Sequence, residues 1–456
     1  MLYEEARVYL DHVSKYGSVL GLESIKGLLG ELGNPQKDLT FIHIAGTNGK
    51  GSILAYLSNI LREAGYRTGS YISPTVMSYL ERFQIDGEYM EEETFAELTC
   101  EVKQAAERLI RKGRTSPTVF EMETAIAFLY FKKEKCDYVV LEAGMGGLLD
   151  ATNIVDTTKL CIFASISMDH IGVLGDTLEE IAENKAGIIK EGAAVVTGPQ
   201  RPEVMKVLER ASAARHAQMV TADAPAVIHE RSLDGQTFSY KEFADMTIRL
   251  LGQHQIENAA TVLEAVRALR RMDVKIGEEA VRSGLEKTRW PGRFMVLGKN
   301  PTVIADGAHN ADAARRLAEN AESYLAGKRI VAVMGVFKDK EYEKIVDIMS
   351  PYMSFVYTVD LPNGERTLPK EELCETLARH DIASEPAETA EEAVRLAVKR
   401  AGADGAVLVF GSLSYLGEVI RLEESAAVVG TRTEKKDGDA ETEEGIRSEE
   451  REGVSW

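Results

Sequence analysis

The sequence predicts an α/β protein of two domains, each built on a mostly parallel sheet. Short apolar stretches of strand type, such as Tyr138–Leu141, alternate with longer stretches whose apolar residues recur at helical spacing, such as residues 91–112. Several strand-like stretches run directly into glycine-rich or polar turns, which is typical of parallel α/β sheets. The alternation restarts after the segment Trp290–Phe294, so we place a domain boundary there, between residues 1–293 and 294–425.

Length and composition fit such a protein and exclude several functional classes. The chain has 456 residues, 44% of them hydrophobic, which is enough for two domains with sizeable cores. Its formal net charge of −19 argues against general affinity for nucleic acid or for an anionic membrane. No apolar run approaches the ~18 residues of a membrane-spanning helix, and no leader pattern opens the chain. The 4 cysteines lack C-x-x-C spacing, so we expect reduced thiols in a cytoplasmic protein.

The first domain begins with a helical segment over residues 1–38 and continues with its most informative feature, a strand–loop–helix unit. A largely apolar run, Leu39–Ile44, leads into a glycine-rich loop, and apolar residues from Ile53 onward recur at helical spacing. Backbone N–H groups of such a loop, aided by the positive end of the helix dipole, can wrap a phosphate. Lys50 would reach the terminal phosphates, and a serine hydroxyl could ligate Mg²⁺. The predicted nucleotide-binding residues are Gly46, Thr47, Asn48, Gly49, Lys50, Gly51 and Ser52.

This loop departs from the common phosphate-binding pattern G-x-x-x-x-G-K-[ST]. The pattern would require glycine at position 44 and serine or threonine at position 51, where this chain has Ile44 and Gly51. A tight turn between a strand and a helix, without any ligand, is the alternative. Two glycines flanking Lys50 are hard to explain by turn geometry alone, so phosphate binding is the favoured interpretation.

The rest of the first domain continues the same alternation. Ligands of parallel sheets lie beyond the carboxyl ends of the strands. The phosphate loop, Glu142 and His170 each follow a strand, so we expect them at one edge of the sheet. The expected elements, in order, are a strand at 68–72, a loop and short hairpin at 80–87, helices at 91–112 and 120–131, strands at 138–142 and 160–166, a helix at 178–190, a strand at 193–197, a helix with antiparallel strands within 201–250, and a helix at 254–271.

Two of these strand-end side chains could hold a metal ion. Glu142 ends an apolar strand, where a carboxylate can bind the Mg²⁺ of a nucleotide; the alternative is an ordinary surface glutamate. His170 follows the next strand beside Asp169, and a lone histidine of this kind is more often structural than a ligand. Because Mg²⁺ prefers oxygen ligands, a histidine ligand would be unusual.

A second, smaller domain of Rossmann-like type is predicted over residues 294–425. At the end of its first strand, Asp306 and His309 offer a carboxylate and an imidazole, and Arg293 at the domain junction could reach a phosphate. After residue 425 the chain is polar and charged, so we expect 426–456 to be a disordered tail. The expected elements are a strand Val303–Asp306, a helix Ala311–Leu325, and strands Ile330–Val336, Phe355–Val359 and Val407–Phe410.

Eight short motifs in a fixed order make the sequence recognisable. They resemble the folylpolyglutamate synthase / dihydrofolate synthase family of the Mur ligase superfamily, and the resemblance extends from residue 1 to about 425. It implies a P-loop-type domain like the Mur ligase central domain, followed by a Rossmann-like ligase domain. The motifs are Gly46-Thr47-Asn48-Gly49-Lys50-Gly51-Ser52, Gly144-Met145-Gly146-Gly147 with Asp150-Ala151-Thr152-Asn153, Asp169-His170, Lys185-Ala186-Gly187-Ile188, Gly252-Gln253-His254-Gln255 with Asn258, Trp290-Pro291-Gly292-Arg293, Asp306-Gly307-Ala308-His309-Asn310 and Gly411-Ser412-Leu413.

The resemblance implies a role for each matching residue. Lys50, His170 and Lys185 are the implied catalytic residues, with Lys50 on the β and γ phosphates. Lys185 matches a lysine that is carbamylated in the family, and a carbamate offers oxygens to Mg²⁺ whereas an ammonium group repels it. The implied metal ligands are Ser73, Glu142 and His170, and the further nucleotide contacts are Asn258, Arg293, Asp306 and His309.

The implied activity is an ATP-dependent ligation. L-glutamate is added to the γ-carboxylate of tetrahydrofolate through an acyl phosphate, with ATP and Mg²⁺ as cofactors. The implied partners are small-molecule substrates, without nucleic acid or membrane, and the implied state is a monomer. The chain departs from the family pattern at Leu148, Thr75 and Ala311, where arginine, histidine and proline are common. The first two departures bear on substrate preference.

Four alternatives remain open at this point. A bifunctional enzyme would also make dihydrofolate from dihydropteroate and L-glutamate, and a murein-type amino-acid ligase is a more distant relative. A folate-binding protein without activity would not need Lys50, Glu142 and His170 intact. A regulatory GTP-binding protein would use Asp169–Gly172 as D-x-x-G and Asn184–Gly187 as the start of N-K-x-D, but Gly187 replaces the specificity aspartate.

Overall fold

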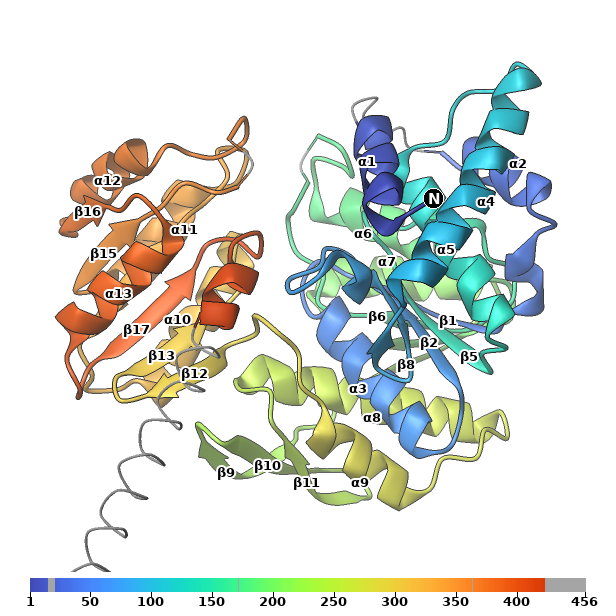
Figure 1. Cartoon of the computed structure of the whole chain (residues 1–456). Helices are drawn as coiled ribbons and strands as arrows, with labels where there is room; N and C mark the ends of the chain where they lie inside the picture. The colour runs from blue at the N-terminus through green and yellow to red at the C-terminus, as the bar shows by residue number, and fades with distance from the viewer. Residues whose placement is uncertain (15–20, 171, 363, 423–456) are drawn as a thin grey trace, which may run out of the picture. The chain divides into compact units, whose positions relative to one another are not determined.

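The computed structural model describes residues 1–14, 21–170, 172–362 and 364–422, which form two compact units (Figure 1). The first unit contains Met1–Phe294 and Asp312–Tyr324, and the second contains Met295–Ala311 and the described residues from Leu325 onward. The tail 426–456, for which the sequence predicts disorder, lies outside the described residues. Among the residues that the structure describes, no helix has both the length and the apolar character needed to cross a membrane.

An eight-stranded sheet organises the first unit, in the order β4-β3-β2-β5-β1-β6-β7-β8. Strands β2, β5, β1, β6, β7 and β8 are parallel, and β3 and β4 extend one edge as an antiparallel hairpin. Because β5, β1 and β6 are adjacent and parallel, the chain leaves all three strands at the same edge of the sheet. The strands are β1 Phe41–Ala45, β2 Thr68–Tyr71, β3 Phe83–Ile85, β4 Glu88–Tyr89, β5 Tyr138–Glu142, β6 Thr158–Phe163, β7 Ala194–Thr197 and β8 Gln218–Thr221.

Helices cover both faces of this sheet, which explains why its central strands β1, β5 and β6 are mostly apolar and buried. Ile42 and Ile44 of β1 pack in a core with α3, α8 and α9, whereas Phe41 packs on the opposite side with α1, α2, α4 and α5. Ala45 packs with α6 and α7. The helices are α1 Tyr3–Ser14, α2 Glu23–Glu31, α3 Lys50–Glu63, α4 Glu92–Arg111, α5 Val119–Lys133, α6 Leu178–Ala186, α7 Pro202–Ala214, α8 Gln253–Arg271 and α9 Glu278–Lys287, with the short 3₁₀ helices η1 Pro35–Asp38, η2 Tyr79–Arg82 and η3 Ala151–Ile154.

The predicted antiparallel strands within residues 201–250 are confirmed. They form a three-stranded sheet, β11-β10-β9, with bounds β9 Val227–Ser232, β10 Gly235–Tyr240 and β11 Phe243–Ile248. Apolar side chains of β10 and β11, among them Phe238 and Met246, join the core of α3, α8 and α9. The small sheet is therefore part of the first unit.

The second unit contains a six-stranded sheet in the order β12-β13-β17-β14-β15-β16. All its pairs are parallel except β12 with β13, which confirms the predicted Rossmann-like α/β type. From Asp312 on, helix α10 (Ala311–Tyr324) groups with the first unit, where Arg316 pairs with Glu257 of α8 at 3.5 Å. The other elements are β12 Met295–Lys299, β13 Thr302–Ala305, β14 Ile330–Met334, α11 Tyr342–Met349, η4 Ser350–Tyr352, β15 Phe355–Thr358, α12 Lys370–Arg379, β16 Ser384–Pro386, α13 Ala390–Ala401 and β17 Ala406–Phe410.

The strand predicted at 160–166 and the helix predicted at 178–190 end three or four residues earlier in the structure, for the same physical reason. The strand expected to reach residue 166 ends at Phe163, because the Ser165 carbonyl accepts a hydrogen bond from Thr47 N at 2.7 Å. The helix expected to reach residue 190 ends at Ala186, after the Asn184 carbonyl accepts Leu148 N at 2.8 Å. In both cases a backbone group near the end of the element is hydrogen-bonded to a loop from another part of the chain.

Candidate active site

Strand β1 delivers the glycine-rich loop to the edge of the sheet, and α3 begins at Lys50. Gly46 and Gly49 have φ of 155° and 92°, a region that favours glycine. A Cβ on Gly51 would lie 2.8 Å from the Trp290 Nε1 atom, too close for any side chain. The departure at position 51 therefore has a steric reason, since the indole of Trp290 occupies the space that a serine or threonine side chain would need.

The segment that follows β6 holds this loop in place. Thr47 N donates to the Ser165 carbonyl at 2.7 Å, and Thr47 Oγ1 donates to the Ser167 carbonyl at 3.0 Å. Ser167 N in turn donates to Thr47 Oγ1 at 3.1 Å. The loop is thus fixed by the neighbouring strand end.

Lys50, Glu142 and Ser73 come together at this edge. The strand ends predict that the phosphate loop meets Glu142, whereas Ser73 is expected there only from the resemblance. The Lys50 Nζ lies 3.7 Å from Glu142 Oε1, and Ser73 N donates to Glu142 Oε2 at 3.4 Å. Glu142 is only 6% exposed, and burial raises the pKa of its carboxyl, against the opposing effect of the Lys50 charge. In its charged form, a carboxylate at this place can offer its oxygens to a metal ion such as Mg²⁺.

Lys185 joins the same group from α6. Its side chain is 3% exposed, and its Nζ donates to the Gly46 carbonyl at 2.9 Å. Burial, and then the nearby charge of Lys50, lower the pKa of the Lys185 ammonium to about 7. A substantial fraction of this amine is therefore neutral near pH 7, which gives it a nucleophilic lone pair that an ordinary lysine lacks.

Asn258 lies against the other side of the loop. Its Nδ2 donates to Gln255 Oε1 at 3.1 Å, and Gln255 Nε2 donates to Ser52 Oγ at 3.2 Å. A Cβ on Gly49 would lie 2.7 Å from Asn258 Oδ1, so the loop and α8 are in close contact. Arg293 is half-buried, and its charge lowers the pKa of Glu142, which places its guanidinium within electrostatic reach of that carboxylate.

His170 differs from the other predicted residues because its side chain is 42% exposed. Its backbone has φ of 51°, its N donates to Asp169 Oδ1 at 2.9 Å, and its Nε2 lies 3.8 Å from Asp169 Oδ2. Within the described part of the chain, no three His, Cys, Asp or Glu side chains are close enough together to hold a metal ion. A metal bound at Glu142 would therefore need further oxygen ligands from hydroxyls, water or substrate.

The remaining two predicted residues belong to the second unit. Asp306 follows β13, and its Oδ1 accepts Ala308 N at 2.8 Å. His309 Nδ1 lies 2.9 Å from the Gly307 carbonyl oxygen, which can only accept, so Nδ1 carries a proton. This turn lies at the carboxyl end of a parallel strand, which is the position expected of a ligand-binding turn.

Two domain families match the chain, and they divide it in the same order as the sequence does. The Mur ligase middle domain matches residues 44–266, and the Mur ligase glutamate ligase domain matches residues 292–413. The dihydrofolate synthase/folylpolyglutamate synthase of Bacillus subtilis is 35% identical over 427 residues, which is 91% of this chain and 98% of that protein. The chain belongs to the folylpolyglutamate synthase/dihydrofolate synthase family.

Other members of the family agree with this result. The folylpolyglutamate synthase of Lacticaseibacillus casei is 32% identical over 81% of this chain and 88% of its own length. A Mycobacterium tuberculosis folylpolyglutamate synthase complexed with ADP and AMPPCP superposes with a TM-score of 0.84 at 28% identity, over 92% of this chain and 99% of that one. The Escherichia coli FolC protein in complex with DHPP and ADP gives 0.82 at 30% identity, over 92% and 98%. The resemblance and the fold predicted from the sequence are confirmed.

In this family member, several polar residues in or beside the motifs hold the site in place, although the resemblance implies no role for them. Gln255 links Ser52 to Asn258, as described above. Asp150, Asn153 and Asn184 hold the loop after β5 through hydrogen bonds to its backbone. The signal was present, since all four lie within or beside the recognised motifs, but a motif does not say which backbone groups its polar side chains will meet.

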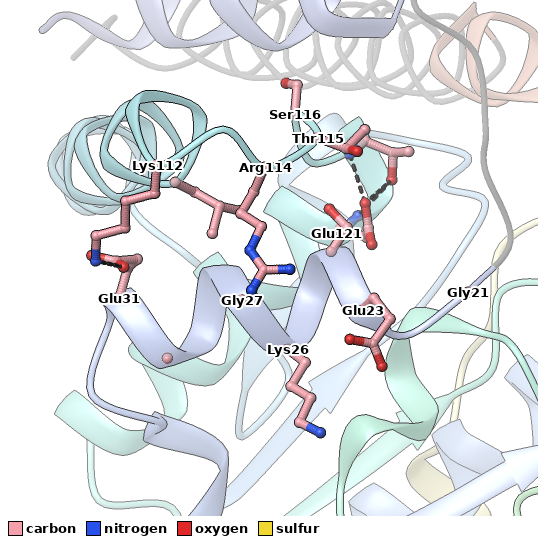
Figure 2. A pocket seen from close by; sticks show the side chains of 14 residues that line it. Gly21, Glu23, Lys26, Gly27, Glu31, Lys112, Arg114, Thr115, Ser116 and Glu121 are labelled. Atoms are coloured by element: carbon pink, nitrogen blue, oxygen red, sulfur yellow. Dashed lines mark hydrogen bonds and ion pairs between the residues drawn. The ribbon is translucent and has the colours of Figure 1, made fainter.

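Figure 2 shows a cavity of about 640 Å³ elsewhere in the first unit of this ligase-family protein, lined by α2, the end of α4 and the start of α5. Lys112 pairs with Glu31 at one end, and Thr118 N donates to Glu121 Oε2 at 2.7 Å at the other. The Arg114 guanidinium is directed toward α2 between them. This cavity and the predicted site share no residue, so the site described above is the candidate for catalysis.

Proposed function

We propose that the protein is an ATP-dependent ligase that adds L-glutamate to the γ-carboxylate of tetrahydrofolate. The observation that carries this proposal is the grouping of Lys50 with the buried Glu142 and Lys185 around the phosphate loop. Membership in the folylpolyglutamate synthase/dihydrofolate synthase family supplies the reaction class and the substrates. ATP binding is supported by the ADP and AMPPCP complexes of the structural neighbours.

The reaction requires three anionic groups to meet, and the chain supplies the counter-charges. The folate γ-carboxylate oxygen attacks the γ-phosphorus of ATP, the bond to the β-phosphate oxygen breaks, and an acyl phosphate and ADP form. The amine of L-glutamate then attacks the acyl carbon and loses a proton. The bond from the acyl carbon to the bridging oxygen breaks, and phosphate leaves with that oxygen. We assign Lys50 and the N–H groups of residues 46–52 to the β and γ phosphates, where their main task is positioning and neutralisation of charge.

We propose Ser73, Glu142 and His170 as the residues that hold Mg²⁺. The donor set fits in part, because Glu142 is a buried carboxylate with Ser73 beside it, and Mg²⁺ is commonly held by one or two carboxylates together with substrate phosphates. His170 is the least suited of the three by chemistry and by exposure. When bound, the ion would withdraw charge from the phosphate oxygens.

Lys185 is proposed to act as a carbamate. Its neutral amine can attack carbon dioxide, forming an N–C bond and releasing one proton, and the pKa of about 7 makes this amine available. The adjacent Lys50 charge, which disfavours the Lys185 ammonium, would favour a carbamate anion at the same position. Carbamate oxygens would then add to the oxygen donors around Glu142.

The remaining assignments concern the nucleotide and the organisation of the chain. Asn258 and Arg293 are proposed to contact the adenine and the phosphates, and Asp306 and His309 to contact the nucleotide from the second unit. We further propose that residues 1–293 and 294–425 act as the two functional domains of a monomeric, cytoplasmic enzyme.

Dihydrofolate synthesis is the second candidate activity. The relatives from Bacillus subtilis and Escherichia coli carry both activities in their names, and the Escherichia coli structure holds DHPP. The regulatory GTP-binding alternative is not supported, because Asn184 and Lys185 lie in the last turn of α6, with Lys185 buried against Gly46. A base-recognition loop would have to leave such residues accessible to a guanine.

One incubation tests the proposal. The protein receives ATP, Mg²⁺ and L-glutamate with either tetrahydrofolate or dihydropteroate, and the products are weighed by mass spectrometry. We expect the tetrahydrofolate product to gain one glutamyl unit, and turnover to fall by ~10²–10³ in Lys50→Ala because a preorganised cation is lost. No product with either acceptor would overturn the assignment, and product with dihydropteroate would add the second activity.

A further inference from the structure

Three segments that are separate in the sequence meet beside Lys185. They are the loop Gly144–Leu148 after β5, the turn Asp150–Asn153 that includes the start of η3, and the end of α6 at Asn184–Gly187. Their contacts are backbone to backbone and side chain to backbone, with few side chains between them. We refer to this junction as the amide clamp, because two asparagine side chains close it.

Asn184 forms the first half of the amide clamp. Its Oδ1 accepts Gly147 N at 3.1 Å, and its own carbonyl accepts Leu148 N at 2.8 Å. A Cβ on Gly146 would lie 2.3 Å from Asn184 Oδ1, and a Cβ on Gly147 would lie 2.6 Å from the Lys185 carbonyl. The paired glycines therefore allow the loop to approach the helix end at hydrogen-bonding distance.

Asn153 forms the second half. Its Nδ2 donates to the Leu148 carbonyl and to the Gly187 carbonyl, both at 3.1 Å, so both amide hydrogens are used. Turning the amide over would place its oxygen against two carbonyl oxygens, so this orientation is the one the surroundings allow. A Cβ on Gly187 would lie 2.5 Å from Leu148 Cα, which shows how closely the two backbones approach.

The clamp is also tied to the strand that carries the phosphate loop. Asp150 accepts Met145 N at 2.7 Å and the hydroxyl proton of Thr152. Because the single Thr152 proton is given to Asp150, Thr152 Oγ1 must accept from His43 Nε2, which lies 2.9 Å away in β1. His43 is fully buried, and burial lowers its pKa to about 3, so it serves as a neutral donor at working pH.

We infer that Asn153 and Asn184 are positioning residues for Lys185. Together they fix the end of α6 against the loop after β5, and this holds the Lys185 Nζ on the Gly46 carbonyl at 2.9 Å. The geometric part of this inference stands on the contacts above. Its catalytic part rests on the proposed function, because it assumes that Lys185 takes part in the ligation.

The clamp also explains how the departure at Leu148 is accommodated. The Leu148 N–H and carbonyl are both bound in the clamp, whereas its side chain is 49% exposed. The position is used through its backbone, so the identity of the side chain can change without loss of the junction.

The test compares Asn153→Asp with Asn59→Asp in the full-length protein. Asn153→Asp keeps the shape, removes both donors and sets a carboxylate against two carbonyls. Asn59 is the control, because its Nδ2 is likewise a hydrogen-bond donor, here of a single bond to Thr288 Oγ1 at 3.0 Å, and it lies outside the clamp. Each variant is treated briefly with an amine-acetylating reagent, and peptide mass spectrometry measures modification of Lys185 against the exposed Lys206. Turnover and the KM for ATP are measured in parallel.

In Asn153→Asp we expect acetylation of Lys185 to rise by ~10–100-fold and turnover to fall by a similar factor, with the KM for ATP within about twofold, since two buried hydrogen bonds are lost and each is worth up to about tenfold. Asn59→Asp should match the wild type in Lys185 labelling. Unchanged Lys185 labelling in a less stable Asn153→Asp protein would make the clamp a purely structural feature and overturn the inference.

A second pair of variants, at Asn184, tests the inference if Asn153→Asp does not fold. Asn184→Asp retains the acceptor for Gly147 N, whereas Asn184→Leu removes it. Labelling of Lys185 should rise in the leucine variant and stay near the wild-type value in the aspartate variant, and equal labelling in both would overturn the inference. If the wild-type protein adds no glutamate, the proposed function fails while the labelling comparison still reports on the clamp.

Discussion

The residues at the ends of β5 and β6, the two strands that flank β1, differ in burial and in hydrogen bonding. At the end of β5, Glu142 is 6% exposed, and after it Asp150 and Asn153 are buried, with the Asp150 carboxylate and the Asn153 Nδ2 bound to backbone groups. After β6, Ser165 and Ser167 are hydrogen-bonded to Thr47 of the phosphate loop. His170 follows, and its side chain is 42% exposed. The residues after β5 are buried and hydrogen-bonded to backbone, whereas the chain after β6 reaches an exposed side chain within a few residues.

This difference indicates which of the predicted catalytic side chains are already positioned before a ligand binds. On the β5 side, glycines, amides and a buried histidine determine the position of each group. On the β6 side, the His170 side chain is 42% exposed, so a ligand would have to displace water from its imidazole, which costs free energy on binding. We therefore expect substitutions on the β5 side to affect turnover steeply and a substitution of His170 to affect it mildly.

The largest expected effect is that of Glu142→Gln. The amide keeps the shape but removes the negative charge that faces Lys50 at 3.7 Å and the oxygen donor for a metal. We expect turnover to fall by ~10²–10³, as for loss of a preorganised charged group, while near-native circular dichroism is retained. Glu88→Gln, at an exposed position on β4, is the control and should keep full activity. A Glu142→Gln enzyme with more than a tenth of wild-type turnover would contradict the comparison.

Lys185→Met should change the pH dependence of stability. The folded-state pKa of Lys185 is about 7, below its ordinary value of 10.5, so the unfolded chain binds more protons between these two values. The cost of burying the ammonium is therefore present in full below pH 7 and disappears as the pH rises toward 10.5. The stability advantage of the methionine variant should shrink over this window by up to about 1.4 kcal/mol per pH unit.

Urea unfolding between pH 6 and pH 10, in buffers free of carbon dioxide, measures this change. Removal of carbon dioxide keeps the amine unmodified, so that proton binding alone is compared. The lost hydrogen bond from Lys185 to Gly46 adds a difference that does not depend on pH. A stability difference that stays constant across the window would show that Lys185 titrates normally.

Much of the fold was readable from the sequence because it depends on local patterns. The apolar run of β1, the glycine loop and the helical spacing of α3 each signal their element without help from the rest of the chain. The ends of β6 and α6 were placed too late, because the carbonyls of Ser165 and Asn184 are taken by distant loops. Such long-range hydrogen bonds leave no trace in a local pattern.

The candidate site shows the same limit. The meeting of Lys50 and Glu142 follows from parallel strands that end at one edge, so topology alone predicts it. The contact between Lys185 and Gly46, and the low pKa that burial gives this lysine, depend on how α6 packs. The two carbonyls that Asn153 reaches are set by the same packing, and no spacing in the sequence announces them.

His170→Ala should have a smaller effect than Glu142→Gln, and this prediction probes the other half of the comparison. The His170 side chain is 42% exposed, and a solvated group contributes less than a buried, preorganised one, so we expect turnover to fall by less than about tenfold. Steady-state kinetics at saturating ATP and L-glutamate measures this effect. A loss as large as that of Glu142→Gln would show that His170 becomes buried in the working complex and that the difference between the two strand ends exists only without ligand.

Leu148→Arg, which restores the residue common in the family, should have the smallest effect on stability. The Leu148 side chain is 49% exposed, and its backbone alone serves the amide clamp, so the free energy of unfolding should change by less than about 0.5 kcal/mol. Urea unfolding checks this value. The informative readout is the ratio of kcat/KM for tetrahydrofolate to that for dihydropteroate, measured in both proteins. A changed ratio at unchanged stability would place substrate selection on the β5 side, at a position whose backbone is fixed and whose side chain is free to vary. An unchanged ratio would limit the role of residue 148 to its backbone.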